Sequence, residues 1–198
     1  MRIRRRSISQ VLLAIVFLLG NSWPVFAGAP TEQIRSAINQ GVEVLKNTKL
    51  DSKKQKAGAV DRLREIVFPL FDFREMAKRS LGPYWRRISS QQQDQFVTAF
   101  TELLEKTYAD KIDLYDGQKV AYTGESIDGN FAAVSTKVIG KDQSYSVDYK
   151  LQLEDGKWKI YDIVAENISL VNNYRAQFNH VLANSSFDDL MQRIKAKG

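Results

Sequence analysis

The chain has 198 residues, with 29 lysines and arginines, 23 aspartates and glutamates, one histidine and no cysteine. The lack of cysteine excludes disulfides and thiol nucleophiles, and one histidine leaves too few ligands for a tetrahedral transition-metal site. Four of the basic residues lie in the first six positions, so 25 basic residues face 23 acidic ones in the rest of the chain, and this near balance argues against a nucleic-acid-binding protein.

Residues 1–27 have the three parts of a secretory signal peptide. A basic start, MRIRRRSISQ, precedes the apolar run VLLAIVFLLG, and Val25-Phe26-Ala27 supplies a small-residue cleavage signal. We expect cleavage after Ala27, because the alternative site after Ala29 would leave Pro30 as the first residue. The apolar run is shorter than the roughly 20 residues of a bilayer span, so an uncleaved anchor is the less favoured alternative. Export without disulfides fits a bacterial periplasm, and residues 28–198 then suit one domain.

Residues 28–117 are expected to be mainly helical. One apolar stripe, which includes Ile34, Ala37 and Ile38, predicts a first helix, and Pro69 and Gly82-Pro83 predict the ends of two later ones. Three further helix starts follow from a capping pattern, in which an acceptor side chain precedes a glutamate or glutamine by three residues. The pattern occurs at Ser52 with Gln55, at Asp72 with Glu75, and at Ser89 with Gln92 or Ser90 with Gln93.

From residue 118 to 166 the apolar period changes from about 3.6 residues to about 2, which predicts a sheet. Short turns at Asp128-Gly129, Gly140–Gln143 and Asp155-Gly156 imply an antiparallel meander with one buried face. The four strands are expected near residues 118–124, 131–139, 144–153 and 157–166. Residues 167–198 then form two C-terminal helices, near 169–183 and 187–196. The expected fold class is α+β, a four-stranded antiparallel sheet wrapped by about six helices.

The residues offer little for catalysis. His180 lies late in a predicted amphipathic helix, and no Gly-x-Ser-x-Gly turn presents a nucleophile to it. Asp162 and Glu166 lie four residues apart on a predicted strand, about 13 Å between Cα atoms, which is too far for a paired-carboxylate mechanism unless a bulge intervenes. We therefore expect both to be structural, with Asp162 bound to a cation or a backbone donor. Asp162 as a lone general base in an apolar pocket stays open as an alternative.

Two stretches of the chain carry recognisable motifs. The first, residues 68–117, carries Phe71-Asp72, Leu81-Gly82, Trp85, Ser90, Gln92, Phe96, Phe100, Leu104 and Tyr108. The second, residues 156–178, carries Trp158, Tyr161-Asp162, Glu166, Ser169-Leu170, Tyr174-Arg175 and Phe178. Both stretches resemble the MlaC, or toluene-tolerance, family. One departure is Asn167, where the family commonly has glycine, so we expect asparagine to adopt left-handed geometry there.

The resemblance implies a fold like that of nuclear transport factor two and a role as a periplasmic carrier of a phospholipid with two acyl chains. Members of this family are the soluble substrate-binding component between an outer-membrane lipoprotein complex and an inner-membrane ABC transporter, in a system that maintains outer-membrane lipid asymmetry. Neither a cofactor nor an enzymatic activity is implied. An isomerase-like enzyme, a protein-interaction domain without a cavity, and a carrier of another lipid such as a hopanoid are the competing hypotheses.

For a lipid carrier, we expect the acyl chains to lie between the inward face of the sheet and the helices. Arg86 and Arg87 are candidates for the headgroup, although a solvated surface is the alternative for each. The predicted lipid-binding residues are Phe96, Phe100, Tyr108, Val134, Val138, Val147, Tyr149, Leu151 and Trp158.

Overall fold

A computed structural model describes residues 30–48 and 52–197. The expected signal peptide and its cleavage site lie outside these ranges. Within them, no helix combines the length and the apolar character that a bilayer span requires.

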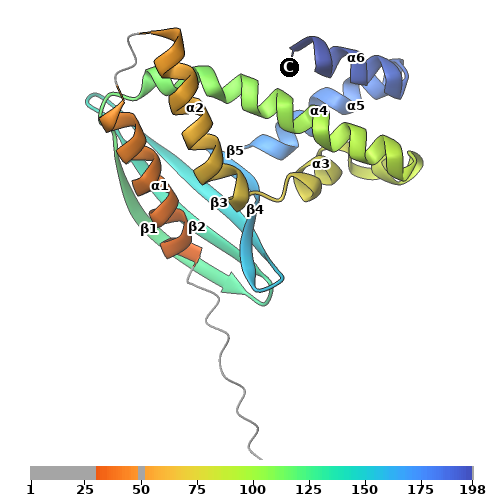
Figure 1. Cartoon of the computed structure of the whole chain (residues 1–198). Helices are drawn as coiled ribbons and strands as arrows, with labels where there is room; N and C mark the ends of the chain where they lie inside the picture. The colour runs from red at the N-terminus through yellow and green to blue at the C-terminus, as the bar shows by residue number, and fades with distance from the viewer. Residues whose placement is uncertain (1–29, 49–51, 198) are drawn as a thin grey trace, which may run out of the picture.

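The described chain is helical at both ends, and the sheet lies between these helical parts, in residues 119–169 (Figure 1). The α-helices are α1 (Pro30–Asn47), α2 (Lys53–Val67), α3 (Phe73–Leu81), α4 (Ser90–Ala109), α5 (Leu170–Asn184) and α6 (Phe187–Lys197). Short 3-10 helices are η2 (Phe68–Leu70), η3 (Gly82–Arg87) and η4 (Asp110–Leu114). The strands are β1 (Lys119–Asp128), β2 (Phe131–Ile139), β3 (Ser144–Glu154), β4 (Lys157–Ala165) and β5 (Ile168–Ser169).

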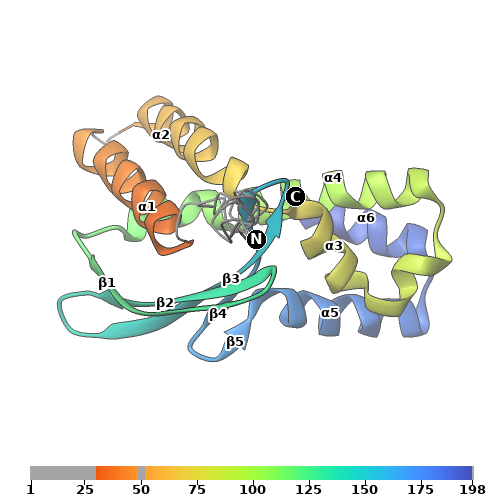
Figure 2. The same cartoon turned by 90° about the horizontal axis from the view of Figure 1, so that it is seen from below.

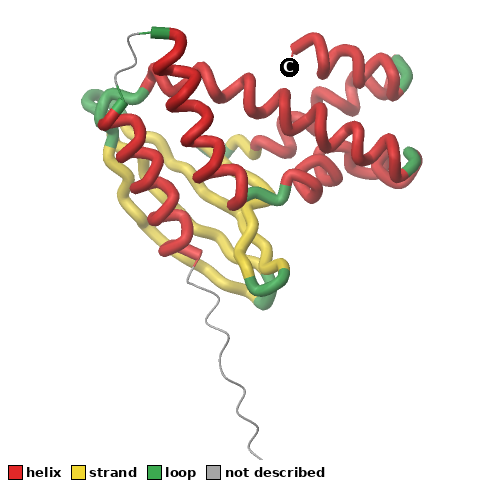
Figure 3. The backbone as a smooth tube through the Cα atoms, in the orientation of Figure 1, coloured by secondary structure: helices red, strands yellow, loops and turns green. Residues whose placement is uncertain are grey.

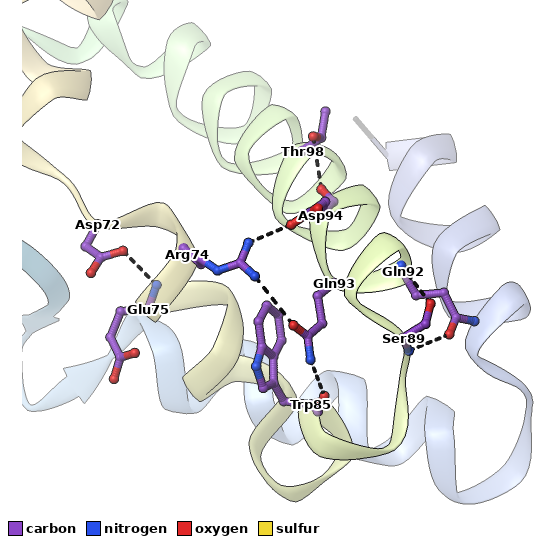
Figure 4. A network of polar contacts seen from close by, with 9 residues as sticks. All are labelled: Asp72, Arg74, Glu75, Trp85, Ser89, Gln92, Gln93, Asp94 and Thr98. Carbon is purple, nitrogen blue, oxygen red and sulfur yellow. Dashed lines mark hydrogen bonds and ion pairs between the residues drawn. The ribbon is translucent and has the colours of Figure 1, made fainter.

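The expected helix starts are confirmed, because the capping side chains accept hydrogen bonds from the free amides of each first turn. The Ser52 hydroxyl caps α2. At α3, the Asp72 carboxylate accepts a bond of 2.8 Å from the Glu75 amide. Of the two possibilities for α4, Ser89 and not Ser90 forms the capping box, since the Gln92 amide donates to the Ser89 hydroxyl and the Ser89 amide donates to the Gln92 side chain (Figure 4).

The strands form one antiparallel sheet in the order β1-β2-β3-β4-β5. Figure 2 shows α1 and α2 over one face of this sheet, whereas no described helix covers the opposite face of β1 to β3. The fold class is therefore as predicted, but the sheet has a fifth strand. Glu166 and Asn167 both adopt left-handed geometry, with φ of 47° and 65°, so the chain reverses and Ile168 pairs with Ala165. The expected left-handed Asn167 is confirmed.

A β-bulge at Tyr161 determines which residues of β4 face the helices. Lys150 lies opposite Asp162 and Leu151 lies opposite Ile160, so Tyr161 is an extra residue on β4. A bulge places two successive side chains on the same side of a strand. As a result, Ile160 and Ile163 both pack toward α1, while Asp162 points to the outer face of the sheet.

Buried apolar side chains form two clusters, one in the helical half of the molecule and one against the sheet. Figure 3 shows these two parts of the backbone, with the helices in red and the strands in yellow. In the helical cluster, Phe96 and Phe100 pack edge to face against Phe178. In the sheet cluster, Ile34 of α1 packs against the inner faces of β2, β3 and β4. Phe71, between η2 and α3, contacts both clusters and so marks their junction.

A polar network fixes α3 and η3 against the start of α4 (Figure 4). The Arg74 guanidinium forms an ion pair of 2.6 Å with Asp94 and lies over the Trp85 ring. The Gln93 side-chain amide donates a bond of 2.9 Å to the Trp85 carbonyl. Trp85 is therefore held through both its ring and its backbone.

Candidate functional site

An apolar cavity of about 560 Å³ lies at the junction of the two clusters. It is bounded by α2, by η2 and α3, by the end of α4, and by β4, β5 and the start of α5. A volume of this size is typical of small-molecule sites, which measure about 300–1,000 Å³.

The α2 wall comes from a helical stripe in which Val60, Leu63, Arg64 and Val67 line the cavity. Their spacing of i, i+3, i+4 and i+7 places them on one face of the helix. Only Ala59 of α2 is buried, so this face covers a hollow space and does not enter a filled core. The stripe is visible in the sequence, but it is equally typical of a helix that packs against a core.

The opposite wall comes from Leu104 and Tyr108 of α4 with Ile112 of η4. Tyr108 is 49% exposed, and Ile168 of β5 is 64% exposed, so these two lining residues lie at the opening. Burial of part of the Tyr108 ring raises the pKa of its hydroxyl above the ordinary value, and the neighbouring Tyr174 adds to the shift. The Tyr108 hydroxyl is therefore neutral at ordinary pH.

The inner end of the cavity is formed by Phe71, Phe73 and Met76 on one side and by Ile163 and Ala165 on the other. Ile163 reaches the cavity only because of the bulge at Tyr161, which shifts the alternation of side chains along β4 by one residue. Regular alternation along β4 would place Ile163 on the face opposite to Trp158 and Ile160, and nothing in the sequence indicates the bulge.

Four lining residues carry polar side-chain atoms: Arg64, Glu105, Asn173 and Tyr108. The Arg64 guanidinium lies 3.4 Å from the Glu105 carboxylate and 5.0 Å from the centre of the Phe68 ring. An ion pair at one edge of an apolar cavity fits a ligand with long apolar parts and one polar end.

Of the nine residues predicted to bind lipid, Tyr108 lines this cavity and the other eight do not. Phe96 and Phe100 are fully buried in the helical cluster, and Val134, Leu151 and Trp158 are buried in the sheet cluster, with Tyr149 packed against it. Val138 and Val147 are half-buried on β2 and β3.

The two arginines considered for a headgroup also lie away from the cavity. Arg86 lines a separate basic pocket on the other side of α3, and the Arg87 guanidinium lies 5.8 Å from the centre of the Tyr84 ring. Arg64, which the sequence analysis did not single out, is the arginine that lines the cavity.

Asp162 and Glu166 have structural partners. The Asp162 carboxylate accepts bonds from the Ser169 hydroxyl (2.6 Å) and the Val171 amide (3.1 Å), which confirms the predicted bond to a backbone donor and holds the start of α5 on β4. Glu166 accepts from the amide and the hydroxyl of Ser146, and these bonds lower the pKa of Glu166. Among the described residues, no group of three or more histidines and carboxylates could hold a metal ion.

A family model described as MlaC protein matches residues 35–196. The chain belongs to the MlaC family. The resemblance of the two sequence stretches to this family is thereby confirmed. One similar MlaC protein, from Haemophilus influenzae, is described as the intermembrane phospholipid transport system binding protein, and it is 23% identical over 139 residues. That match covers 67% of this chain and 65% of the Haemophilus protein, slightly less than two thirds of its length.

The toluene tolerance protein ttg2D of Pseudomonas putida is 25% identical over 189 residues, which are 94% of this chain and 86% of that protein. A solved structure of a phospholipid-binding protein from Ralstonia solanacearum, in complex with a phospholipid, superposes with a TM-score of 0.73 at 22% identity. The superposition covers 85% of this chain and 96% of the Ralstonia chain, so the two proteins share one fold.

Proposed function

We propose that this member of the MlaC family is a soluble periplasmic phospholipid carrier that holds the acyl chains in the cavity between α2, α4 and β4. The observation that carries the proposal is the cavity itself, about 560 Å³ with mainly apolar walls and an ion pair at one edge. The names of the Haemophilus and Ralstonia proteins, which refer to phospholipid, support it.

Burial of the acyl chains would supply the binding energy. Each methylene removed from water gains about 0.8 kcal/mol, so two chains of roughly 15 methylenes would gain on the order of 24 kcal/mol before the costs of ordering. The polar headgroup would lie at the opening, near Arg64, Tyr108 and Ile168. This assignment moves the site from the inner sheet face to the cavity and keeps only Tyr108 from the residues predicted earlier.

The cellular setting follows from the family and is part of the same proposal. The carrier would exchange lipid with an inner-membrane ABC transporter complex and an outer-membrane lipoprotein complex, and so maintain outer-membrane lipid asymmetry. The name of the Haemophilus relative, as the binding protein of an intermembrane phospholipid transport system, supports this setting.

The competing hypothesis of an isomerase with Asp162 as base has less support. The Asp162 carboxylate does not line the apolar cavity, and two of its acceptor positions are occupied by Ser169 and Val171. A base must instead be free to take a proton from a bound substrate. We therefore assign Asp162 no catalytic role.

The first test is solvent extraction and mass spectrometry of protein purified from a bacterial envelope. Phospholipid should be recovered in a fixed ratio to protein, and delipidated protein should take up phospholipid again from vesicles. Protein that contains no lipid and cannot be loaded would rule out the carrier function. Recovery of a hopanoid in place of phospholipid would support a carrier function with a different lipid as cargo.

The second test places a charge at the opening of the cavity. Ile168→Asp should reduce phospholipid loading severalfold, because a carboxylate at the opening repels the phosphate of the headgroup placed there and disfavours the passage of an apolar chain. The matched control is Ile127→Asp, since Ile127 is also a strand isoleucine and is 55% exposed, but it does not line the cavity. Equal loading of the two variants would exclude this opening as the entry of the lipid.

A further inference from the structure

A second pocket, basic and about 370 Å³ in volume, lies on the other side of α3 from the lipid cavity. Its walls come from α3, η3, the outer face of β3 and β4, and the start of α5. The cationic side chains that line it are Lys78, Arg79, Arg86, Lys150 and Arg175, and the one lining carboxylate is Asp162.

The positive charge of this pocket is largely uncompensated. Lys78 and Arg79 share the single carboxylate of Glu75. Among the residues that the structure describes, no carboxylate forms an ion pair with Arg86, Lys150 or Arg175. A cluster of unpaired cations around a concave surface attracts anionic groups.

Aromatic side chains complete the pocket. The Arg79 guanidinium lies 4.1 Å from the centre of the Tyr161 ring, and Trp85 also lines the pocket. Trp85 is held in place by Arg74 and Gln93, so its position is fixed before any ligand arrives. Arginine, tyrosine and tryptophan are the residues enriched at the centres of protein–protein interfaces.

The basic pocket and the lipid cavity lie on opposite sides of one wall. On β4, Asp162 lines the pocket and Ile163 lines the cavity, and on α5 Asn172 lines the pocket and Asn173 lines the cavity. The headgroup of a lipid whose chains occupy the cavity would therefore lie on the cavity side of this wall, away from the basic pocket. An anion bound in the basic pocket would then belong to a different molecule.

We propose that the basic pocket is a docking site for an acidic segment of a partner protein. Guanidinium groups bind carboxylates through paired, planar hydrogen bonds, and three arginines line this pocket. The mixture of arginine with tryptophan and tyrosine favours a peptide over a lipid surface, because these three residue types are enriched in the cores of protein–protein interfaces. The docked segment would lie against the reverse side of the cavity wall.

The test uses a fluorescent peptide of eight glutamates, measured by anisotropy at low and at physiological salt, with an octaglutamine peptide as reference. The acidic peptide should bind, and Arg86→Glu with Lys150→Glu should weaken binding about tenfold or more, as expected for contacts at the centre of an interface. Both side chains are exposed, so the variant should keep its fold, which circular dichroism checks. In NMR spectra of the isotope-labelled full chain, the backbone amide signals of Gly82 and Asn172 should shift when the acidic peptide is added.

The matched control is Lys53→Glu with Lys54→Glu, which changes the net charge equally on an exposed turn of α2 away from the pocket. This control should bind the acidic peptide as the unmodified chain does. Equal losses in the two variants would show that only net charge matters and would overturn the proposal. Absence of peptide binding would overturn the proposal too. A third contrary result would be that the chain binds phosphatidylglycerol vesicles and that the double variant Arg86→Glu with Lys150→Glu loses vesicle binding but keeps peptide binding.

Discussion

The Arg64 guanidinium on α2 and the Glu105 carboxylate on α4 form an ion pair of 3.4 Å that joins two walls of the apolar cavity. The two helices are otherwise separated at this point by the cavity itself. Both side chains are in contact with solvent, at 53% and 25% exposure. An exposed ion pair of this kind contributes about 0–1 kcal/mol to stability, and because it joins α2 to α4 we expect it to act mainly on how readily the walls separate.

Glu105→Gln should therefore accelerate lipid exchange more than it destabilises the fold. We expect a loss of less than about 1 kcal/mol in the free energy of unfolding and a severalfold faster transfer of phospholipid to acceptor vesicles, because α2 is no longer tied to α4. Urea denaturation measures the first quantity and a fluorescent-lipid transfer assay the second.

A second ion pair on α2 provides the control. Lys56 binds Asp113 at 2.6 Å, joins α2 to η4, has similar exposure and does not line the cavity. Asp113→Asn should leave the transfer rate unchanged. A similar acceleration in both variants would mean that transfer depends on loosening of α2 as a whole and not on the Arg64–Glu105 pair.

Asp162→Asn should destabilise the fold by about 1.5–3 kcal/mol, because the charged acceptor of the Ser169 hydroxyl and the Val171 amide is replaced by a neutral side chain with one oxygen. Urea denaturation at neutral pH measures this loss. Asp148→Asn is the control, since Asp148 lies on neighbouring β3 and its side chain forms no hydrogen bond or ion pair with the described residues. Equal stability of the two variants would contradict the capping role of Asp162.

Gly82→Ala should destabilise the fold by about 1–3 kcal/mol. Gly82 has φ of +57°, so any other residue strains the backbone there, and an added Cβ 2.9 Å from the Arg175 Nε would also displace the flexible end of the Arg175 side chain. Gly58→Ala is the reference, because nothing lies within 4 Å of its added Cβ. In the middle of α2 it should stabilise by about 0.5–1 kcal/mol. Thermal unfolding of the two variants should shift in opposite directions.

Tyr149 gives a prediction at alkaline pH. Burial raises its pKa to about 12, and the nearby Tyr122 adds to this shift while the Thr136 hydroxyl opposes it. A tyrosine whose pKa is raised in the folded state stabilises the fold fully below the unfolded pKa of about 10 and loses this contribution as pH rises to about 12. The stability advantage of the unmodified chain over Tyr149→Phe should shrink by about 2 kcal/mol across this window.

Denaturation in urea at successive pH values measures that difference, and tyrosinate absorbance gives the titration directly. Tyr145→Phe, on the same strand at an exposed position, controls for the loss of a hydroxyl group. A constant difference between the unmodified chain and Tyr149→Phe from pH 10 to pH 12 would contradict the raised pKa of Tyr149.

Helix starts and turns were readable from the sequence because they depend on residues three or fewer positions apart. Ser52, Asp72 and Ser89 cap their helices as expected. The left-handed geometry of Asn167 was also predictable, since few residues tolerate it. Its effect, a short extra strand, was not predicted, because that depends on where the reversed chain meets β4.

The sequence by itself determined the family, the α+β class and the order of helices and strands, because periodicity, capping and turn chemistry are local properties. Only the tertiary structure decided where the cavity lies. Phe96, Phe100 and Val134 carry the same apolar signal as Leu63, Val67 and Ile112, yet the first group fills the two clusters and the second lines the cavity. A cavity forms where helices and strands that are distant in the chain do not pack in contact with one another. The spacing between such elements is not encoded in any local sequence pattern.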